Sequence, residues 1–147
     1  MPAKVVASKT RPTTASVSAF LKDVADPSQR ADCLAMVELM VEATGEKPRM
    51  WGTSIVGFGE VFCPGSGGRL SHAPLLGFAP RKCALSVYLV DGVHQHDAQL
   101  AALGEHDMGT GCLYLWNLAS VDLKVLRRIL AASVKNSKRM FLNRLPA

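Results

Sequence analysis

The stretch LLGFAPRKCALSVYLV, residues 75–90, decides the fold class of this chain. Two apolar runs, 75–80 and 83–90, are separated by a short basic turn, and Pro80 ends the first run because proline interrupts a strand. The second run alternates with the period of a β-strand, in which Cys83, Leu85, Val87 and Leu89 face one way and Ser86 and Tyr88 the other. Two strands with so short a connection pair antiparallel, so an antiparallel sheet is expected.

Two further strands are expected on either side of this pair. SIVGFGEVFC, residues 54–63, is rich in β-branched and aromatic residues, and Gly57 and Gly59 indicate a bulge or a close backbone approach within one strand. PGSGG, residues 64–68, is typical of a turn or loop. CLYLWNL, residues 112–118, predicts a fourth strand.

Two helices are predicted before the strands. Ser16 is a good N-cap for a first helix, with apolar residues from Val17 to Val24 at helical spacing. Asp26 and Pro27 suit the start of a second helix, which runs to about Thr44 and stops at Gly45. Its expected apolar stripe is Leu34, Val37 and Val41, widened by Cys33, Met36 and Met40.

Two more helices are predicted after the third strand. HDAQLAALG, residues 96–104, reads as a short helix, and Asp122 caps a long C-terminal helix. The expected buried stripe of the long helix is Leu126, Ile129, Leu130, Ser133 and Val134.

These elements predict an α+β fold. A single, mainly antiparallel sheet of about four to five strands, packed against N-terminal and C-terminal helices, buries the apolar faces most simply. Residues 1–13 are expected to form a flexible basic arm, 14–138 a single domain, and 139–147 a C-terminal tail.

Composition narrows the function classes. The 147 residues are 48% hydrophobic and 20% charged, which is typical of a globular protein. No apolar run approaches the ~20 residues of a membrane span, and the polar N-terminus is unlike a secretory signal, so a cytoplasmic protein without a membrane partner is expected. The net charge of +5 comes from basic termini that lack interleaved aromatic residues, which argues against nucleic-acid binding.

The four cysteines are Cys33, Cys63, Cys83 and Cys112. They are widely spaced, with no C-x-x-C pair of the kind that holds zinc or forms a redox couple. Each lies in an apolar run, so four buried, reduced thiols are expected, in keeping with a reducing cytoplasm.

Several phrases, in this order and spacing, resemble one family. They are TTASVSAFL, RADCLAMVELM, PRMWGTSIVGFGE, LLGFAPRK, ALSVYLVDG, LGEHDMGTGCLYL and LASVDLKVLRRILAASV. Together they span about Thr13 to Val134 and resemble the YdhG-like bacterial domains, a largely uncharacterised family. The resemblance implies a compact α+β domain. Some members have been likened to frataxin, and one is described as an iron chaperone. Where the related branch has lysines before CLY, this chain has Glu105, Asp107 and Thr110, which weakens the case for a basic anion site there.

A metal site is one candidate. Imidazole and carboxylate groups together bind iron, zinc or manganese. The candidate ligands are His94, His96, His106 and Asp107, with Asp97 and Glu105 beside them. The competing interpretation is two polar loop ends flanking a surface helix, with Asp97 as its N-cap. Iron or another divalent metal is the cofactor that this site would take.

A ligand site is the second candidate, made of Arg49, Trp51, Ser54, Arg81 and Lys82. Arginine and lysine bind carboxylates or phosphates, and an indole offers a stacking wall. In an antiparallel sheet the entrance to the first strand and the turn at 81–82 can be neighbours. The competing interpretation makes Trp51 a core anchor and the basic residues exposed turn residues.

The function expected from these patterns is a non-enzymatic module that binds an unidentified small molecule or protein partner. Cys112 with His106 as its base is a conceivable nucleophile, but no residue supplies the orienting third group of a catalytic site. Iron or metal handling is the alternative. Self-association is a further alternative. An exposed strand edge, or an apolar patch carrying Met40 or Trp116, would support it.

Overall fold

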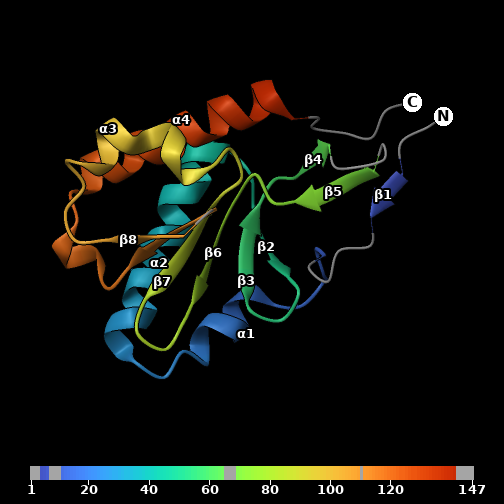
Figure 1. Cartoon of the computed structure of the whole chain (residues 1–147). Coiled ribbons are helices and arrows are strands. Elements are labelled where there is room, and N and C mark those ends of the chain that lie inside the picture. The colour runs from blue at the N-terminus through green and yellow to red at the C-terminus, as the bar shows by residue number, and fades with distance from the viewer. Residues whose placement is uncertain (1–3, 7–10, 65–68, 110, 142–147) are drawn as a thin grey trace.

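The computed structural model describes residues 4–6, 11–64, 69–109 and 111–141, and Figure 1 shows their arrangement. Its main feature is a six-stranded sheet in the order β2-β3-β6-β7-β9-β8, in which every neighbouring pair is antiparallel. The strands are β2 (Pro48–Trp51), β3 (Ile55–Phe58), β6 (Leu76–Pro80), β7 (Leu85–Leu89), β8 (Asp107–Met108) and β9 (Cys112–Leu115). The α+β class and the mainly antiparallel pairing are therefore confirmed.

The predicted hairpin lies at the centre of this sheet. Strands β6 and β7 pair from Leu76 opposite Leu89 to Pro80 opposite Leu85. The amide of Arg81 donates to the carbonyl of Ala84 at 2.8 Å and closes the turn. The apolar side of the β7 alternation faces the core, where Leu85, Val87 and Leu89 are each at most 1% exposed.

The α-helices in the described part of the chain are α1 (Val17–Lys22), α2 (Pro27–Thr44), α3 (Asp97–Leu100) and α4 (Leu123–Met140). The predicted caps are confirmed, because the side chains of Ser16, Asp26 and Asp122 accept backbone amides and Gly45 ends α2 in the left-handed conformation, at φ 70°. The segment 96–104 is less helical than expected. A 3₁₀ turn, η2 (Val93–His96), precedes α3, and Asp97 begins that helix rather than capping it.

The buried face of α2 matches the predicted stripe in part, at Cys33, Met36 and Met40. Cys33, Met36, Leu39 and Met40 are buried, whereas Leu34 is 54% and Val41 39% exposed. The reason is that α2 carries apolar residues around most of its circumference, so the sequence pattern alone does not select one face. Since Met40 is fully buried, it belongs to no exposed apolar patch, whereas Trp116 is 48% exposed.

A second sheet corrects the expectation of a single one. It has the order β1-β5-β4, with β1 (Lys4–Val6), β4 (Val61–Pro64) and β5 (Arg69–Ala73). The stretch 54–63 is thus two strands in two sheets, because Gly59 turns the chain at φ 65° between β3 and β4. The strand count exceeds the prediction, since β1, β2, β5 and β8 were not foreseen. Of the predicted turn 64–68, residues 65–68 lie outside the described residues.

Parts of the predicted N-terminal arm make backbone contacts with both sheets. Within 1–13, Lys4–Val6 pair parallel with Arg69–Ser71 of β5. The amide of Thr13 donates to Met50 at 2.7 Å, and that of Gly52 donates to Arg11 at 2.8 Å, along the edge of β2. Helix α4 reaches Met140, and the tail from 142 onward lies outside the described residues.

The core lies between the six-stranded sheet and helices α2 and α4, which cover one of its faces (Figure 1). Phe78, Val87 and Leu113 pair across β6, β7 and β9 and belong to the same buried cluster as Met36 and Ile129 of the helices. The opposite side of the sheet, which we call the outer face, carries the alternate residues of each strand. No helix among the residues described is long and apolar enough to cross a membrane.

Candidate functional site

The outer face is built around two glycines. The strand registers place Arg49, Gly57, Gly77, Tyr88 and Cys112 in one row across β2, β3, β6, β7 and β9. A β-carbon on Gly57 would collide with the indole of Trp51, and one on Gly77 would lie 3.3 Å from Pro74 Cγ. The centre of the row therefore has no side chains of its own, and neighbouring groups pack directly on the backbone.

A cavity of about 470 Å³ opens beside this row, between the outer face and the segment that follows β5. This volume falls within the range of small-molecule sites, about 300–1,000 Å³. Its wall is mainly apolar and includes Ile55, His72, Pro74, Tyr88, Val90 and Gly111. Gly77 contributes to its shape, since the missing side chain lets Ile55 and Pro74 approach the sheet.

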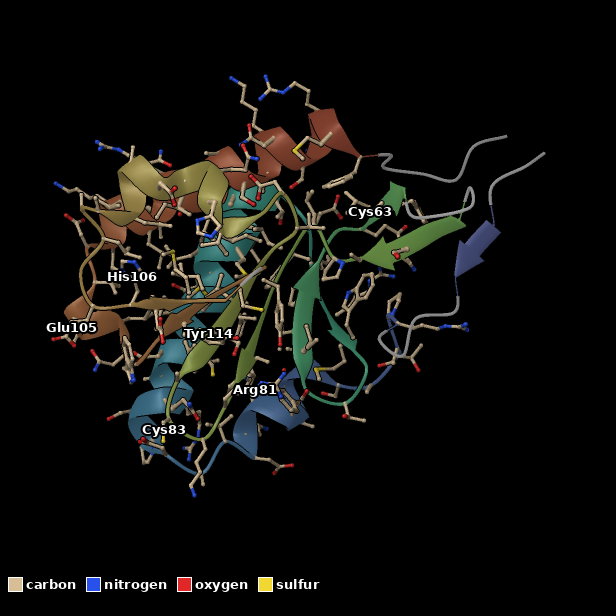
Figure 2. All side chains as sticks on the ribbon, in the orientation of Figure 1. Cys63, Arg81, Cys83, Glu105, His106 and Tyr114 are labelled. Carbon is tan, nitrogen blue, oxygen red and sulfur yellow. The ribbon has the colours of Figure 1, made fainter. Side chains whose placement is uncertain are left out.

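Arg81 and Ser54, two of the five predicted ligand residues, are brought together at the far side of Tyr88. One guanidinium nitrogen of Arg81, Nη2, donates to the Tyr88 hydroxyl at 2.8 Å, and Nη1 donates to Ser54 Oγ at 3.4 Å. Figure 2 shows the labelled Arg81 and Tyr114 side chains over the strands of the six-stranded sheet. Tyr88 thus forms part of the cavity wall with its ring and holds Arg81 with its hydroxyl.

Tyr88 is the residue of this group that sequence reasoning missed. The signal was present, because the β7 alternation predicts that Ser86 and Tyr88 face away from the core. A half-buried tyrosine on the strand face opposite α2 and α4 has its ring against neighbours and its hydroxyl free for a polar partner.

Arg49 and Trp51 form a separate group. Trp51 is fully buried, as the core-anchor interpretation predicts. Arg49 lies over its ring, with Cζ 5.9 Å from the ring centroid. Arg49 also pairs with Glu60 at 3.4 Å. Lys82 is exposed in the turn and lines the same hollow as Ser54 and Arg81, which is not the cavity on the outer face. The five predicted residues therefore do not converge on one site.

The Trp51 group joins the two sheets. His72 of β5 stacks on Phe62 of β4, with ring centroids 4.6 Å apart and planes 7° apart. The same imidazole meets Trp51 edge-on at 4.9 Å, and its Nε2 lies 2.7 Å from Glu60 Oε2. These contacts hold β4 and β5 against the outer face and so define one side of the cavity.

The predicted metal ligands are placed apart. His94 is exposed beside Asp97, with Nδ1 3.3 Å from Oδ1, and His106 donates Nδ1–H to the carbonyl of Gly104 at 2.7 Å. Asp107 is exposed on β8, and its Oδ1 accepts the amide of Met108. Within the described ranges, no three His, Cys, Asp or Glu side chains gather in a way that would hold a metal ion.

His96 takes part in a buried network instead. Its Nε2 lies 2.8 Å from Asp91 Oδ2, and Asp91 also accepts Ser133 Oγ–H at 2.5 Å and Asn136 Nδ2–H at 3.2 Å. Burial acts to raise the pKa of Asp91, but the hydrogen bonds from His96, Ser133 and Asn136 outweigh it and leave that pKa below 3.8, its ordinary value. The network links the end of β7 to α4.

The cysteines depart from the expectation of four buried thiols. Cys33 alone is buried, Cys63 and Cys112 are half-buried, and Cys83 is exposed in the turn after β6. Burial, with the charge of Asp32, raises the pKa of Cys33 to about 11. Burial also raises the pKa of Cys112, against the opposing effects of Tyr114 and Arg81. A raised pKa keeps the Cys112 thiol protonated, which argues against a nucleophilic role.

Comparison with family models, with curated proteins and with solved structures finds no match for this chain.

Proposed function

We propose that this chain is a non-enzymatic binding module of the YdhG-like type, which holds a small molecule in the cavity on the outer face of its six-stranded sheet. The observation that carries the proposal is the cavity itself, about 470 Å³ in volume, with a mainly apolar wall that includes Tyr88, whose hydroxyl accepts a hydrogen bond from Arg81. Sites with this composition are typical of small-molecule binding, in which apolar groups supply contact area and a few polar groups fix orientation.

The iron-handling alternative has no comparable support. It needs His94, His96 and His106 to converge, and in the described part of the chain each is engaged by a different local partner. His96 would also have to leave Asp91, to which it is hydrogen-bonded inside the core.

The proposal is tested with N-phenyl-1-naphthylamine, a neutral apolar dye that fluoresces when it leaves water. We expect saturable, one-site binding to the wild-type chain. Gly111→Phe should weaken it by at least about tenfold, because Gly111 lines the cavity, has no strained backbone angle, and has open space where its β-carbon would be. The new side chain would therefore occupy cavity volume without a clash at its first atom.

Ala131→Phe is the matched control. It adds the same side chain to an exposed position of α4, on the other side of the sheet, and should leave dye binding unchanged. A wild-type chain that unfolds cooperatively but shows no saturable dye fluorescence would contradict the proposal. So would a Gly111→Phe variant that binds as tightly as Ala131→Phe.

A further inference from the structure

We infer that the ligand of this cavity is an organic acid: an apolar body that fills the cavity and a carboxylate that binds Arg81. This inference rests on the proposed function and adds the chemical class of the ligand. It depends on which charged side chains around the cavity already have a partner.

Arg81 is a cation whose hydrogen-bond partners are neutral. Its two side-chain contacts are the hydroxyls of Tyr88 and Ser54, and no ion pair joins it to a carboxylate among the residues that the structure describes. Asp23 and Asp26 line the hollow on its other side, but neither is paired with it. Further guanidinium donors remain for a planar, two-oxygen acceptor such as a carboxylate.

The other ionisable groups of the cavity wall are already engaged. Asp91 has its two oxygens occupied by Ser133, His96 and Asn136, and His72 lies against Glu60. The Asp91 side chain is fully buried and the His72 imidazole already contacts a carboxylate, so neither is available to pair with a ligand. Arg81 is the charged group next to the cavity that has no opposite charge within the described residues.

Tyr88 connects this charge to the apolar volume. Tyr88 lines the cavity and its hydroxyl accepts a hydrogen bond from Arg81 Nη2 at 2.8 Å, so the guanidinium is held beside a residue of the cavity wall before a ligand arrives. Pre-positioning lowers the cost of binding, because the long side chain is not immobilised by the ligand alone. A neutral ligand of the same shape would fill the cavity but leave the cation unpaired.

The test is competition against bound N-phenyl-1-naphthylamine by octanoate and by octan-1-ol, which share an alkyl chain and differ in the head group. We expect octanoate to displace the dye from wild type at a concentration about tenfold lower than octan-1-ol, because hydrogen bonds to charged groups are the stronger ones. The difference should shrink as salt is raised, since the Arg81 side is exposed to solvent.

Arg81→Gln should remove the preference for octanoate over octan-1-ol, measured as the ratio of the two competing concentrations in the same variant. Arg128→Gln is the matched control, because it changes the net charge equally at an exposed position of α4 and should keep the preference. Dye binding with equal competition by the two compounds in wild type would overturn the inference and leave the cavity proposal standing, as would an Arg81→Gln variant that still prefers octanoate. Absence of dye binding would overturn the proposed function and this inference together.

Discussion

Asp91 is a carboxylate in the core that no cation of lysine or arginine accompanies in the described ranges. Its side chain is fully buried, and three side chains from two other segments hydrogen-bond to it. A buried carboxylate is tolerated when its oxygens accept hydrogen bonds in this way. Removing one of these partners lowers the free energy of unfolding. Asp91 follows β7 and is hydrogen-bonded to residues of η2 and α4. Protonation of Asp91 should therefore weaken the contact between these helices and the sheet.

Acidification should therefore destabilise the protein partly through Asp91. Its pKa is lowered in the folded state, so the stabilisation is present above the unfolded-state pKa and is lost as pH falls through the folded value. We expect the wild-type free energy of unfolding to decline below about pH 4. Asp91→Asn should cost roughly 1–3 kcal/mol at neutral pH and show a flatter decline in acid. Urea unfolding at several pH values measures both.

Asp97→Asn is the control for this experiment, because Asp97 belongs to the same segment but its side chain is 66% exposed. It should change the free energy of unfolding by less than about 0.5 kcal/mol. An Asp91→Asn variant with the wild-type pH dependence would show that the buried network contributes nothing to acid stability.

Among the elements, α2 is the helix whose ends follow from its sequence more fully than its buried face does. Its ends were predicted from Asp26, Pro27 and Gly45, which act locally through capping and backbone conformation. Its buried face was predicted only in part: Cys33, Met36 and Met40 are buried as expected, but Leu34 and Val41 face solvent. The face is selected by contact with the sheet and α4, which the sequence of the helix does not contain.

Two substitutions on α2 test the corrected face. Met36→Ala should cost about 2–5 kcal/mol, because Met36 is fully buried and its removal leaves a cavity in the core. Leu34→Ala should cost less than about 0.5 kcal/mol, since its side chain is already largely in water. Chemical denaturation of the two variants compares them directly. Equal losses, or a larger loss at Leu34, would contradict the described orientation of α2.

At the scale of the whole molecule, the small sheet is attached to the large one by aromatic contacts on the outer face. The Trp51 indole packs against the backbone of Gly57 and contacts the His72 ring edge-on. The His72 ring in turn stacks on Phe62 of β4. The same contacts set one side of the cavity, so the packing of the two sheets and the proposed site depend on the same few residues.

Gly57→Ala should disturb this contact. The added methyl group would overlap the Trp51 indole and lie 2.9 Å from Pro74 Cβ, so we expect a loss of about 1–3 kcal/mol and a change in the fluorescence of Trp51. Gly111→Ala is the control, because its β-carbon meets open space and it should be near neutral. A Gly57→Ala variant with wild-type stability and emission would contradict the described contact between Trp51 and Gly57.

The features that depend on near neighbours in the chain could be predicted from the sequence. Helix caps, the period of β7, the turn at 81–84 and the antiparallel hairpin follow from residues a few positions apart, so local chemistry predicts them. The sequence also placed Arg81 and Ser54 among the candidate ligand residues, without identifying Tyr88 as their common neighbour.

How these elements combine depends on contacts between segments that are distant in the chain. The division of 54–63 between two sheets, the buried face of α2 and the separation of Arg49 from Arg81 all depend on strand register and on packing between distant segments. The physical reason is that Gly59 permits a turn without requiring one, and that one residue of register decides which side chains share a face.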